Sequence, residues 1–225
     1  MGKVYNLQKP MSLQIHTIVS QPFAENTYVV WHDGRHAVVV IDPGLEPDLI
    51  LDFLTERALR PAVILNTHGH ADHIAGNEAL KQSFPDAPLI IGKDDEPLLS
   101  DPMANMSAPF GFEIISPPAD RLVREGDQLE FEGLTFDVLD IPGHSPGHVV
   151  FVLRGEPATR VFGGDVLFQG SIGRTDFPGG DMRLLVSGIR KKLYPMPDDT
   201  VVYPGHGPTT TIGAEKRTNP FVRPV

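Results

Sequence analysis

Residues 67–73 read Thr-His-Gly-His-Ala-Asp-His, and the apolar run Ala-Val-Ile-Leu stands just before them at residues 62–65. Such a run is typical of a buried strand, so the heptapeptide places three imidazoles and a carboxylate where a strand ends in a loop. Neutral ring nitrogens and carboxylate oxygens are usual protein ligands of divalent metal ions. A lone histidine is more often a packing or surface residue, but three within six residues need a common partner when they are buried. The stretch therefore predicts a metal site at a strand end.

Ligand-type side chains recur in the same setting further along the chain. Three more apolar runs end in Gly or Pro, namely 136–141 before His144, 161–162 before Asp165 and 201–203 before His206. Side chains just past strand ends can converge on one edge of a sheet. The resulting set is too large for one tetrahedral ion and suits two ions that share a carboxylate. Its seven members are His68, His70, Asp72, His73, His144, Asp165 and His206.

Apolar periodicity predicts an α/β protein in which strands and helices alternate. Strands are expected at 15–19, 27–31, 37–41, 62–65, 89–91, 128–131, 134–141, 149–153 and 161–162, with another before His206. Asp33-Gly34 predicts a hairpin turn between the second and third strands. Helices are expected from Pro47 to Ala58, over 76–84 and over 182–193, the last capped by Asp181 and stopped by Pro195. This order indicates two sheets sandwiched between helices.

Residues 94–120 differ from the rest, because five prolines alternate there with Met and Phe side chains. The pattern predicts a long loop with one apolar side. Such loops often have functional roles, so this one could form a lid or a pocket wall over the metal site. The alternative is an ordinary surface loop whose Met and Phe side chains fill gaps in the core.

Composition fits a catalytic domain and limits its partners. With 225 residues and 40% apolar content, the chain can bury a full core, and we expect a single domain over residues 1–225. There is no cysteine, so a metal must be held by nitrogen and oxygen. A net charge of −10 without a stripe of Lys and Arg argues against a nucleic-acid partner. The first ten residues lack the apolar core of a signal peptide and no stretch is long enough to span a bilayer, so we expect a cytoplasmic protein without a membrane partner.

The motifs together resemble the metallo-β-lactamase superfamily and, within it, the small glyoxalase II-like hydrolases. The resemblance rests on residues 67–73, on Gly-His-Ser-Pro-Gly-His at 143–148, on Gly-Asp at 164–165 and on Pro-Gly-His-Gly at 204–207. It implies a four-layer αβ/βα sandwich of two mixed β-sheets flanked by helices. We expect no counterpart in this chain of the separate helical C-terminal domain of full-length glyoxalase II enzymes, a departure that counts against glutathione as the thiol.

The resemblance also implies roles for the candidate residues. His68, His70 and His144 would hold one ion, Asp72, His73 and His206 the second, and Asp165 would bridge them. Both ions would be divalent, with zinc first and iron or manganese as alternatives. Asp42 and His148 would lie behind the ligands and orient them, although Asp42 could equally cap the turn that it makes with Pro43 and Gly44.

The chemistry expected of two bridged ions is hydrolysis. A water shared by two Lewis acids loses its proton near neutral pH, and the resulting hydroxide would be the nucleophile. Asp72 and Asp165 would support this catalysis as metal ligands, whereas Ser145 lies between Gly and Pro and is expected to be a turn residue. The resemblance implies a small-molecule thioester substrate, with S-lactoylglutathione first.

Two cationic side chains are candidates for binding the substrate. Arg174 stands where glyoxalase II-like proteins carry a cationic residue that binds the carboxylate of glutathione, and Lys216 could add a second contact. For Arg174 the alternative is a salt bridge to Asp176 or Asp181. For Lys216 the alternative is a solvent-facing position.

Other functions compete with hydrolysis of a thioester. If this chain were a persulfide dioxygenase of the same superfamily, His68, His144 and Asp165 would hold a single iron. Those dioxygenases usually have no histidine at the position of His148, so His148 favours the hydrolase. A true β-lactamase is disfavoured by Asp165, and a flavodiiron-type oxygen reductase by His70. A protein that only stores or senses metal is disfavoured because structural sites are usually closed and four-coordinate.

Overall fold

Two six-stranded sheets face each other in the computed structural model, which describes residues 12–155 and 158–223. The first sheet has, in spatial order, β1 (Leu13–Ser20), β2 (Glu25–His32), β3 (Ala37–Ile41), β4 (Arg60–Asn66), β5 (Leu89–Gly92) and β6 (Arg121–Val123). The second has β14 (Thr210–Thr211), β13 (Val201–Pro204), β10 (Arg160–Gly164), β9 (Val149–Leu153), β8 (Leu134–Asp140) and β7 (Gln128–Phe131). Each sheet contains parallel and antiparallel pairs, so both are mixed. A separate hairpin joins β11 (Leu167–Phe168) to β12 (Ser171–Ile172).

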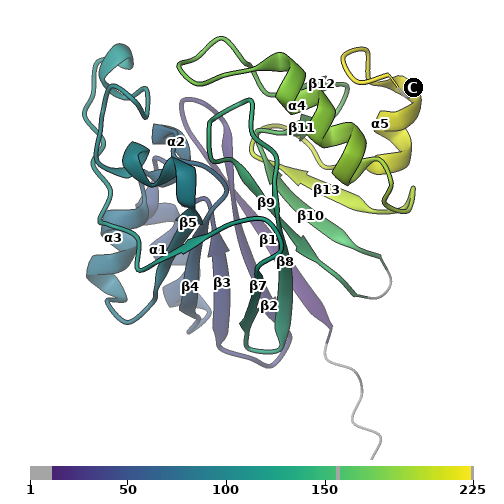
Figure 1. Ribbon diagram of the computed structural model, residues 1–225. Helices are drawn as coiled ribbons and strands as arrows, with labels where there is room; N and C mark the ends of the chain where they lie inside the picture. Colours follow the sequence, from purple (N-terminus) through teal and green to yellow (C-terminus); the bar gives the residue numbers. More distant parts are fainter. Residues whose placement is uncertain (1–11, 156–157, 224–225) are drawn as a thin grey trace, which may run out of the picture.

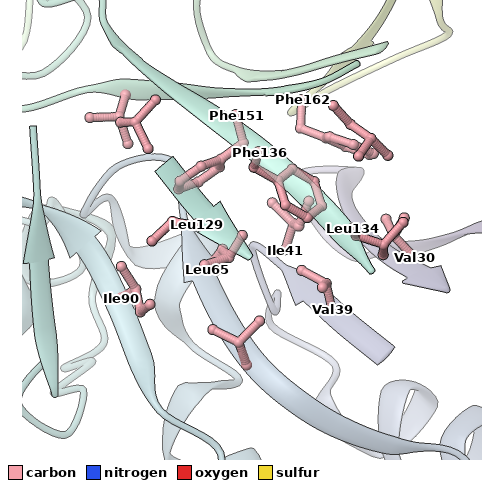
Figure 2. Packing of buried hydrophobic residues seen from close by; sticks show 14 of the residues in the cluster. Val30, Val39, Ile41, Leu65, Ile90, Leu129, Leu134, Phe136, Phe151 and Phe162 are labelled. Carbon is pink, nitrogen blue, oxygen red and sulfur yellow. The ribbon is translucent and has the colours of Figure 1, made fainter. Parts of the chain in front are cut away.

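The apolar runs build two layers of core because successive strand side chains point to opposite faces of a sheet. In β9, Val149 and Phe151 point into the space between the sheets, whereas Val150 and Val152 belong to the outer face of the second sheet. Figure 2 shows side chains from both sheets meeting in the inner layer, with Ile41 and Leu65 of the first sheet opposite Phe136 and Phe151 of the second. Both faces of these strands are buried, which explains why their sequences are continuously apolar.

Helices cover the outer face of each sheet, which makes four layers in all. On the first sheet α1 (Pro47–Glu56) and α3 (Asn77–Ser83) bury Ile50, Leu54 and Leu80 against the strands. On the second sheet α4 (Met182–Gly188), the π-helical turn η3 (Ile189–Leu193) and α5 (Ile212–Thr218) do the same. Figure 1 shows the two sets of helices on opposite sides of the paired sheets. The predicted four-layer sandwich of two mixed sheets is therefore confirmed.

Several boundaries differ from the sequence predictions, and the short elements were not predicted. α1 stops at Glu56, and Ala58, expected within it, has a left-handed backbone (φ 53°) that no helix continues. Residues 71–74, expected as loop, form the one-turn helix α2 (Ala71–Ile74). The segment 94–120 contains the 3-10 turns η1 (Lys93–Leu99) and η2 (Ala108–Phe110). The elements α2, β6 and β14, of four, three and two residues, are too short for periodicity to reveal.

The N-terminal segment on which the expected lack of a signal peptide rests lies outside the described residues. Within the described ranges, none of the helices combines the length and the apolar character needed to cross a bilayer.

Asp181 caps α4 as the sequence predicts. Its Oδ1 accepts hydrogen bonds from the backbone N–H groups of Arg183 (2.7 Å) and Leu184 (3.1 Å), which have no partner within the helix. We expect Asp181→Ala to lower the free energy of unfolding by about 1 kcal/mol and Asp181→Asn by a few tenths at most. Denaturant unfolding of the three proteins measures this, and an alanine variant as stable as the wild type would contradict the cap.

Candidate metal centre

The predicted metal ligands lie just beyond the carboxyl ends of strands, and these ends meet at one edge of the two sheets. His68 and His70 follow β4, His144 follows β8, Asp165 follows β10 and His206 follows β13. Asp72 and His73 lie on α2, which begins directly after the loop that carries the first two histidines. The short helix turns both side chains back toward the strand ends.

The side chains gather into two groups whose ligand atoms all lie within 4.8 Å of one another. The first group is His68, His70 and His144, in which His70 Nδ1 and His144 Nε2 are 2.8 Å apart. The second group is Asp72, His73 and His206, in which His206 Nε2 lies 3.3 Å from Asp72 Oδ2 and 3.4 Å from His73 Nε2. The structure thus brings together the two sets that the resemblance implies.

Asp165 lies between the two groups and turns one oxygen toward each. Its Oδ2 is 3.4 Å from His144 Nε2 in the first group. Its Oδ1 is 3.5 Å from His73 Nε2 and 3.6 Å from His206 Nε2 in the second group. This is the arrangement expected of a carboxylate that bridges two ions.

Hydrogen bonds at the outer ring nitrogens orient four of the histidines. Nδ1 of His144 donates to the carbonyl oxygen of Arg174 (2.8 Å), and Nδ1 of His206 donates to that of Phe23 (3.0 Å). Nδ1 of His73 faces Asp42 Oδ2 (3.1 Å), and Nδ1 of His68 faces the hydroxyl oxygen of Thr67 (3.1 Å). These acceptors engage Nδ1 of each ring, so each Nε2 is left to face the interior of the cluster, where it can ligate a cation.

Asp42 supports the ligands and does not cap its own turn. Its carboxylate accepts hydrogen bonds from the backbone N–H of Thr67 (2.7 Å) and from the Thr67 hydroxyl (2.7 Å), in addition to the contact with His73. The Thr67 hydroxyl, having donated its proton to Asp42, is free to accept from His68. The alternative considered from the sequence is wrong, since the N–H of Gly44 donates to the Thr27 hydroxyl instead.

The electrostatics of the cluster suit a bound cation. Burial and the neighbouring histidines lower the pKa of His68 well below its usual value, and they lower that of His70 to about 3, so both rings are neutral. Burial raises the pKa of Asp165, but His73 and His144 outweigh that effect and lower it, so the carboxylate is charged. His68 Nε2 and Asp165 Oδ1 are buried and have no hydrogen-bond partner among the described residues. Buried ligand atoms of this kind need a cation to satisfy them, so the residues fit a metal centre.

His148 lies directly beneath the first group. Its ring stacks on that of His68 with centroids 4.7 Å apart, and its Nε2 accepts a hydrogen bond from the backbone N–H of Asp165 (3.1 Å). Gly164, next to Asp165, has a left-handed backbone (φ 46°), and a side chain there would clash with both Thr67 and His148. The Gly-Gly-Asp sequence therefore lets β10 turn sharply and bring Asp165 against its neighbours.

A cavity of about 380 Å³ opens beside the two groups, and part of segment 94–120 forms one of its walls. Asn105, Met106, Phe110 and Phe112 line it, which resolves the alternatives left by the sequence in favour of a pocket wall. The described lining residues outside the metal cluster are mostly apolar. A substrate in this cavity would contact the metal centre on one side and mostly apolar side chains on the other.

Arg174 lies at the edge of this cavity with about half of its side chain exposed. Its guanidinium pairs with Asp176 through two hydrogen bonds of 2.8 and 2.7 Å and stacks on the ring of Phe177 at 3.7 Å. The alternative salt bridge to Asp176 is therefore present in the structure, whereas Asp181 caps α4. Arg174 can meet a substrate carboxylate only by sharing or exchanging this partner.

Comparison with known proteins identifies the family. Residues 20–206 match the description of the metallo-beta-lactamase superfamily. The chain belongs to this superfamily. It is 39% identical over 212 residues to hydroxyacylglutathione hydrolase GloC of Haemophilus influenzae, a match that covers 93% of this chain and 98% of that protein.

Two solved structures of the superfamily are also similar. BLEG-1, described as a B3 metallo-beta-lactamase, matches with a TM-score of 0.88 and 39% sequence identity. The match covers 93% of this chain and 99% of the BLEG-1 chain. TTHA1623, solved in a di-iron-bound form, matches with a TM-score of 0.79 and 40% sequence identity. The match covers 92% of this chain and 99% of the TTHA1623 chain. A relative that binds two irons agrees with the two ligand groups found here.

Asp95 is a buried residue beside the metal ligands that the sequence analysis did not identify. It lies on η1 and accepts hydrogen bonds from the N–H of Gly69 (2.9 Å), the hydroxyl of Ser145 (2.6 Å) and the N–H of Gly147 (2.5 Å). Gly69 belongs to the loop of His68 and His70, and Ser145 to the loop of His144. One carboxylate therefore ties together the two loops that carry the first ligand group. No sequence signal separated it from the exposed acidic residues on either side.

Lys216 lies away from the cavity. It is on α5, where its ammonium group contacts Asp198 Oδ1 (2.7 Å) and the carbonyl oxygen of Met196 (3.1 Å). It is absent from the described residues that line the cavity. The expectation that Lys216 binds substrate is corrected, because its contacts join α5 to the segment before β13.

Proposed function

We propose that this protein is a metal-dependent hydrolase of thioesters and that its substrate is S-lactoylglutathione or a related hydroxyacylglutathione. The observation that carries the proposal is the position of Asp165, whose two oxygens face separate groups of ligand atoms. The similarity to GloC, a hydroxyacylglutathione hydrolase, supports the substrate class. The products are glutathione and a hydroxy acid.

The proposed cofactors are two divalent ions. His68, His70 and His144 would hold the first, Asp72, His73 and His206 would hold the second, and Asp165 would be shared. We favour zinc on the nature of the ligands, and the di-iron form of TTHA1623 makes iron the main alternative. When bound, such ions lower the pKa of a water molecule toward neutrality and polarise a carbonyl.

The chain's own residues position the ligands and exclude another nucleophile. Asp42 and the carbonyls of Arg174 and Phe23 fix the orientation of His73, His144 and His206 through Nδ1, so little reorganisation is needed during the reaction. Ser145 is fully buried and donates its hydroxyl to Asp95, so it has no access to a substrate carbonyl. The Arg174 guanidinium at the cavity edge is the group that would meet a carboxylate of glutathione.

Anaerobic hydrolysis of S-lactoylglutathione by the purified, metal-replete protein tests the proposal. Turnover that disappears after treatment with a chelator and returns with added metal is the expected result. Absence of turnover, together with oxygen consumption in the presence of glutathione persulfide, would contradict the hydrolase and support the mononuclear-iron dioxygenase.

Hydrolysis of β-lactams is a second candidate, favoured by the high similarity to BLEG-1. The same protein preparation should be offered a penicillin and a carbapenem in parallel with the thioester. We expect turnover of the thioester to exceed that of either β-lactam, and the opposite order would replace the proposed substrate.

A further inference from the structure

Five of the twelve phenylalanines in the chain line the cavity beside the metal centre. They come from four separate segments. Phe23 lies in the turn between β1 and β2, Phe110 and Phe112 lie in the wall segment, Phe168 lies on β11 and Phe177 precedes α4. Rings collected from such distant parts of the sequence indicate a built surface for an apolar group.

The aromatic surface begins at the metal ligands themselves. The ring of Phe177 packs edge-on against His70 with centroids 5.5 Å apart, and that of Phe168 packs in the same way against His206 at 6.2 Å. His70 belongs to the first ligand group and His206 to the second. A substituent on a carbonyl held between the groups would therefore meet aromatic carbon on both sides.

Hydrogen bonds fix the aromatic wall to the metal centre. The carbonyl of the buried Asn105 accepts from the N–H of Ala71 at the start of α2 (2.9 Å), while its side-chain amide donates to the carbonyls of Leu98 and Ile114. The carbonyl of Phe23 orients His206, and its ring packs against that of Phe110 at 5.4 Å. Asn105 and Phe23 thus each connect the aromatic wall to a segment that carries metal ligands.

Charge in the cavity is confined to the metal cluster and the edge. Among the described lining residues outside that cluster, Arg174 is the one charged side chain, and it is paired with Asp176. The glutathione moiety carries two carboxylates and an ammonium group, all costly to place against apolar rings. Its place is therefore the exposed edge near Arg174, which leaves the aromatic interior to the acyl group.

We propose that this cavity selects thioesters whose 2-hydroxyacyl group carries an apolar, ring-sized substituent, so that aryl-substituted acyl groups are preferred to lactoyl. The inference rests on the proposed thioester hydrolysis and names the acyl class. A methyl group would leave most of the cavity of about 380 Å³ unfilled, whereas a phenyl group would bury its faces against the aromatic rings of the lining.

The matched substrates S-mandeloylglutathione and S-lactoylglutathione test this inference, because they differ by a phenyl in place of a methyl group. Each kcat/KM is divided by the rate constant for hydrolysis of the same thioester by hydroxide, which removes the difference in intrinsic reactivity. We expect the normalised ratio to favour mandeloyl by at least about tenfold. Phe110→Ala and Phe112→Ala should each lower this ratio mainly by slowing the mandeloyl thioester.

Met103→Ala is the matched control, since Met103 is on the same segment, is 64% exposed and is absent from the cavity lining. It should leave the ratio unchanged. A wild-type ratio of one or less with rapid lactoyl turnover would overturn the inference alone, as would an equal loss for both substrates in the phenylalanine variants. No turnover of either thioester by metal-replete protein would overturn the proposed function, and the inference with it.

Discussion

Replacing Asp165 with alanine is expected to abolish turnover while the fold survives. The carboxylate turns one oxygen to each ligand group, so in the proposed two-ion centre its loss would remove a ligand from both ions at once. Loss of a residue that merely orients a metal ligand already costs about 10- to 100-fold, so loss of the shared ligand should lower kcat/KM for the thioester by more than about 100-fold. Steady-state kinetics and bound metal per chain are the measurements.

Thermal unfolding of the same variant separates a catalyst from a structural metal site. Most of the hydrophobic core lies between the two sheets and beneath the outer helices, so we expect Asp165→Ala to remain folded. Asp199→Ala, at an exposed aspartate before β13, is the matched control and should behave as the wild type. Full activity of Asp165→Ala would show that the bridging assignment is wrong. Global unfolding of the variant would favour a structural ion.

The second large effect is expected at Asp95. Alanine at this position leaves two backbone N–H groups and the Ser145 hydroxyl without their acceptor in a buried setting. Each unsatisfied group costs roughly 1–3 kcal/mol, so we expect the free energy of unfolding to fall by about 3 kcal/mol or more. Because the two loops carry His68, His70 and His144, we also expect the first ion to bind about 10- to 100-fold more weakly.

Metal affinity distinguishes a positioning role for Asp95 from a purely structural one. Chelator competition on Asp95→Ala should show weakened binding of one ion and near-normal binding of the other, while Asp95→Asn, which keeps one acceptor oxygen, should lie between. Asp94→Ala, at the exposed neighbour on η1, is the control. If Asp95→Ala loses stability but binds both ions as tightly as the wild type, Asp95 has no role in positioning the ligands.

Two sheets between helices could be predicted from the order of strands and helices, and the convergence of the ligands from their positions just past strand ends. Continuous apolar runs such as Val149–Leu153 indicate strands buried on both faces, and strand ends fix where His144, Asp165 and His206 must lie. The Gly-Gly-Asp and Pro-Gly-His sequences mark the sharp turns that such an edge requires. The motif positions and the strand pattern thus describe the same edge of the molecule.

The residues that surround the ligands could not be predicted in the same way. Asp95 lies in an acidic run, and only the packing of η1 against two loops distinguishes it from exposed Asp94. The aromatic cavity combines side chains from four segments, and no local pattern links Phe23 to Phe110. Lys216 illustrates the opposite error, since its ammonium group pairs with Asp198 and it is absent from the described cavity lining. Long-range packing decides each of these cases.

Stepwise reconstitution of metal-free protein tests the two-ion hydrolytic centre most directly. Zinc is added in fractions of an equivalent, and bound metal and S-lactoylglutathione turnover are measured at each step. Two ions should bind per chain, and turnover should rise mainly with the second, because both ligand groups and the shared Asp165 are then engaged. Full turnover with a single bound ion, or two bound ions without thioester hydrolysis, would contradict the account.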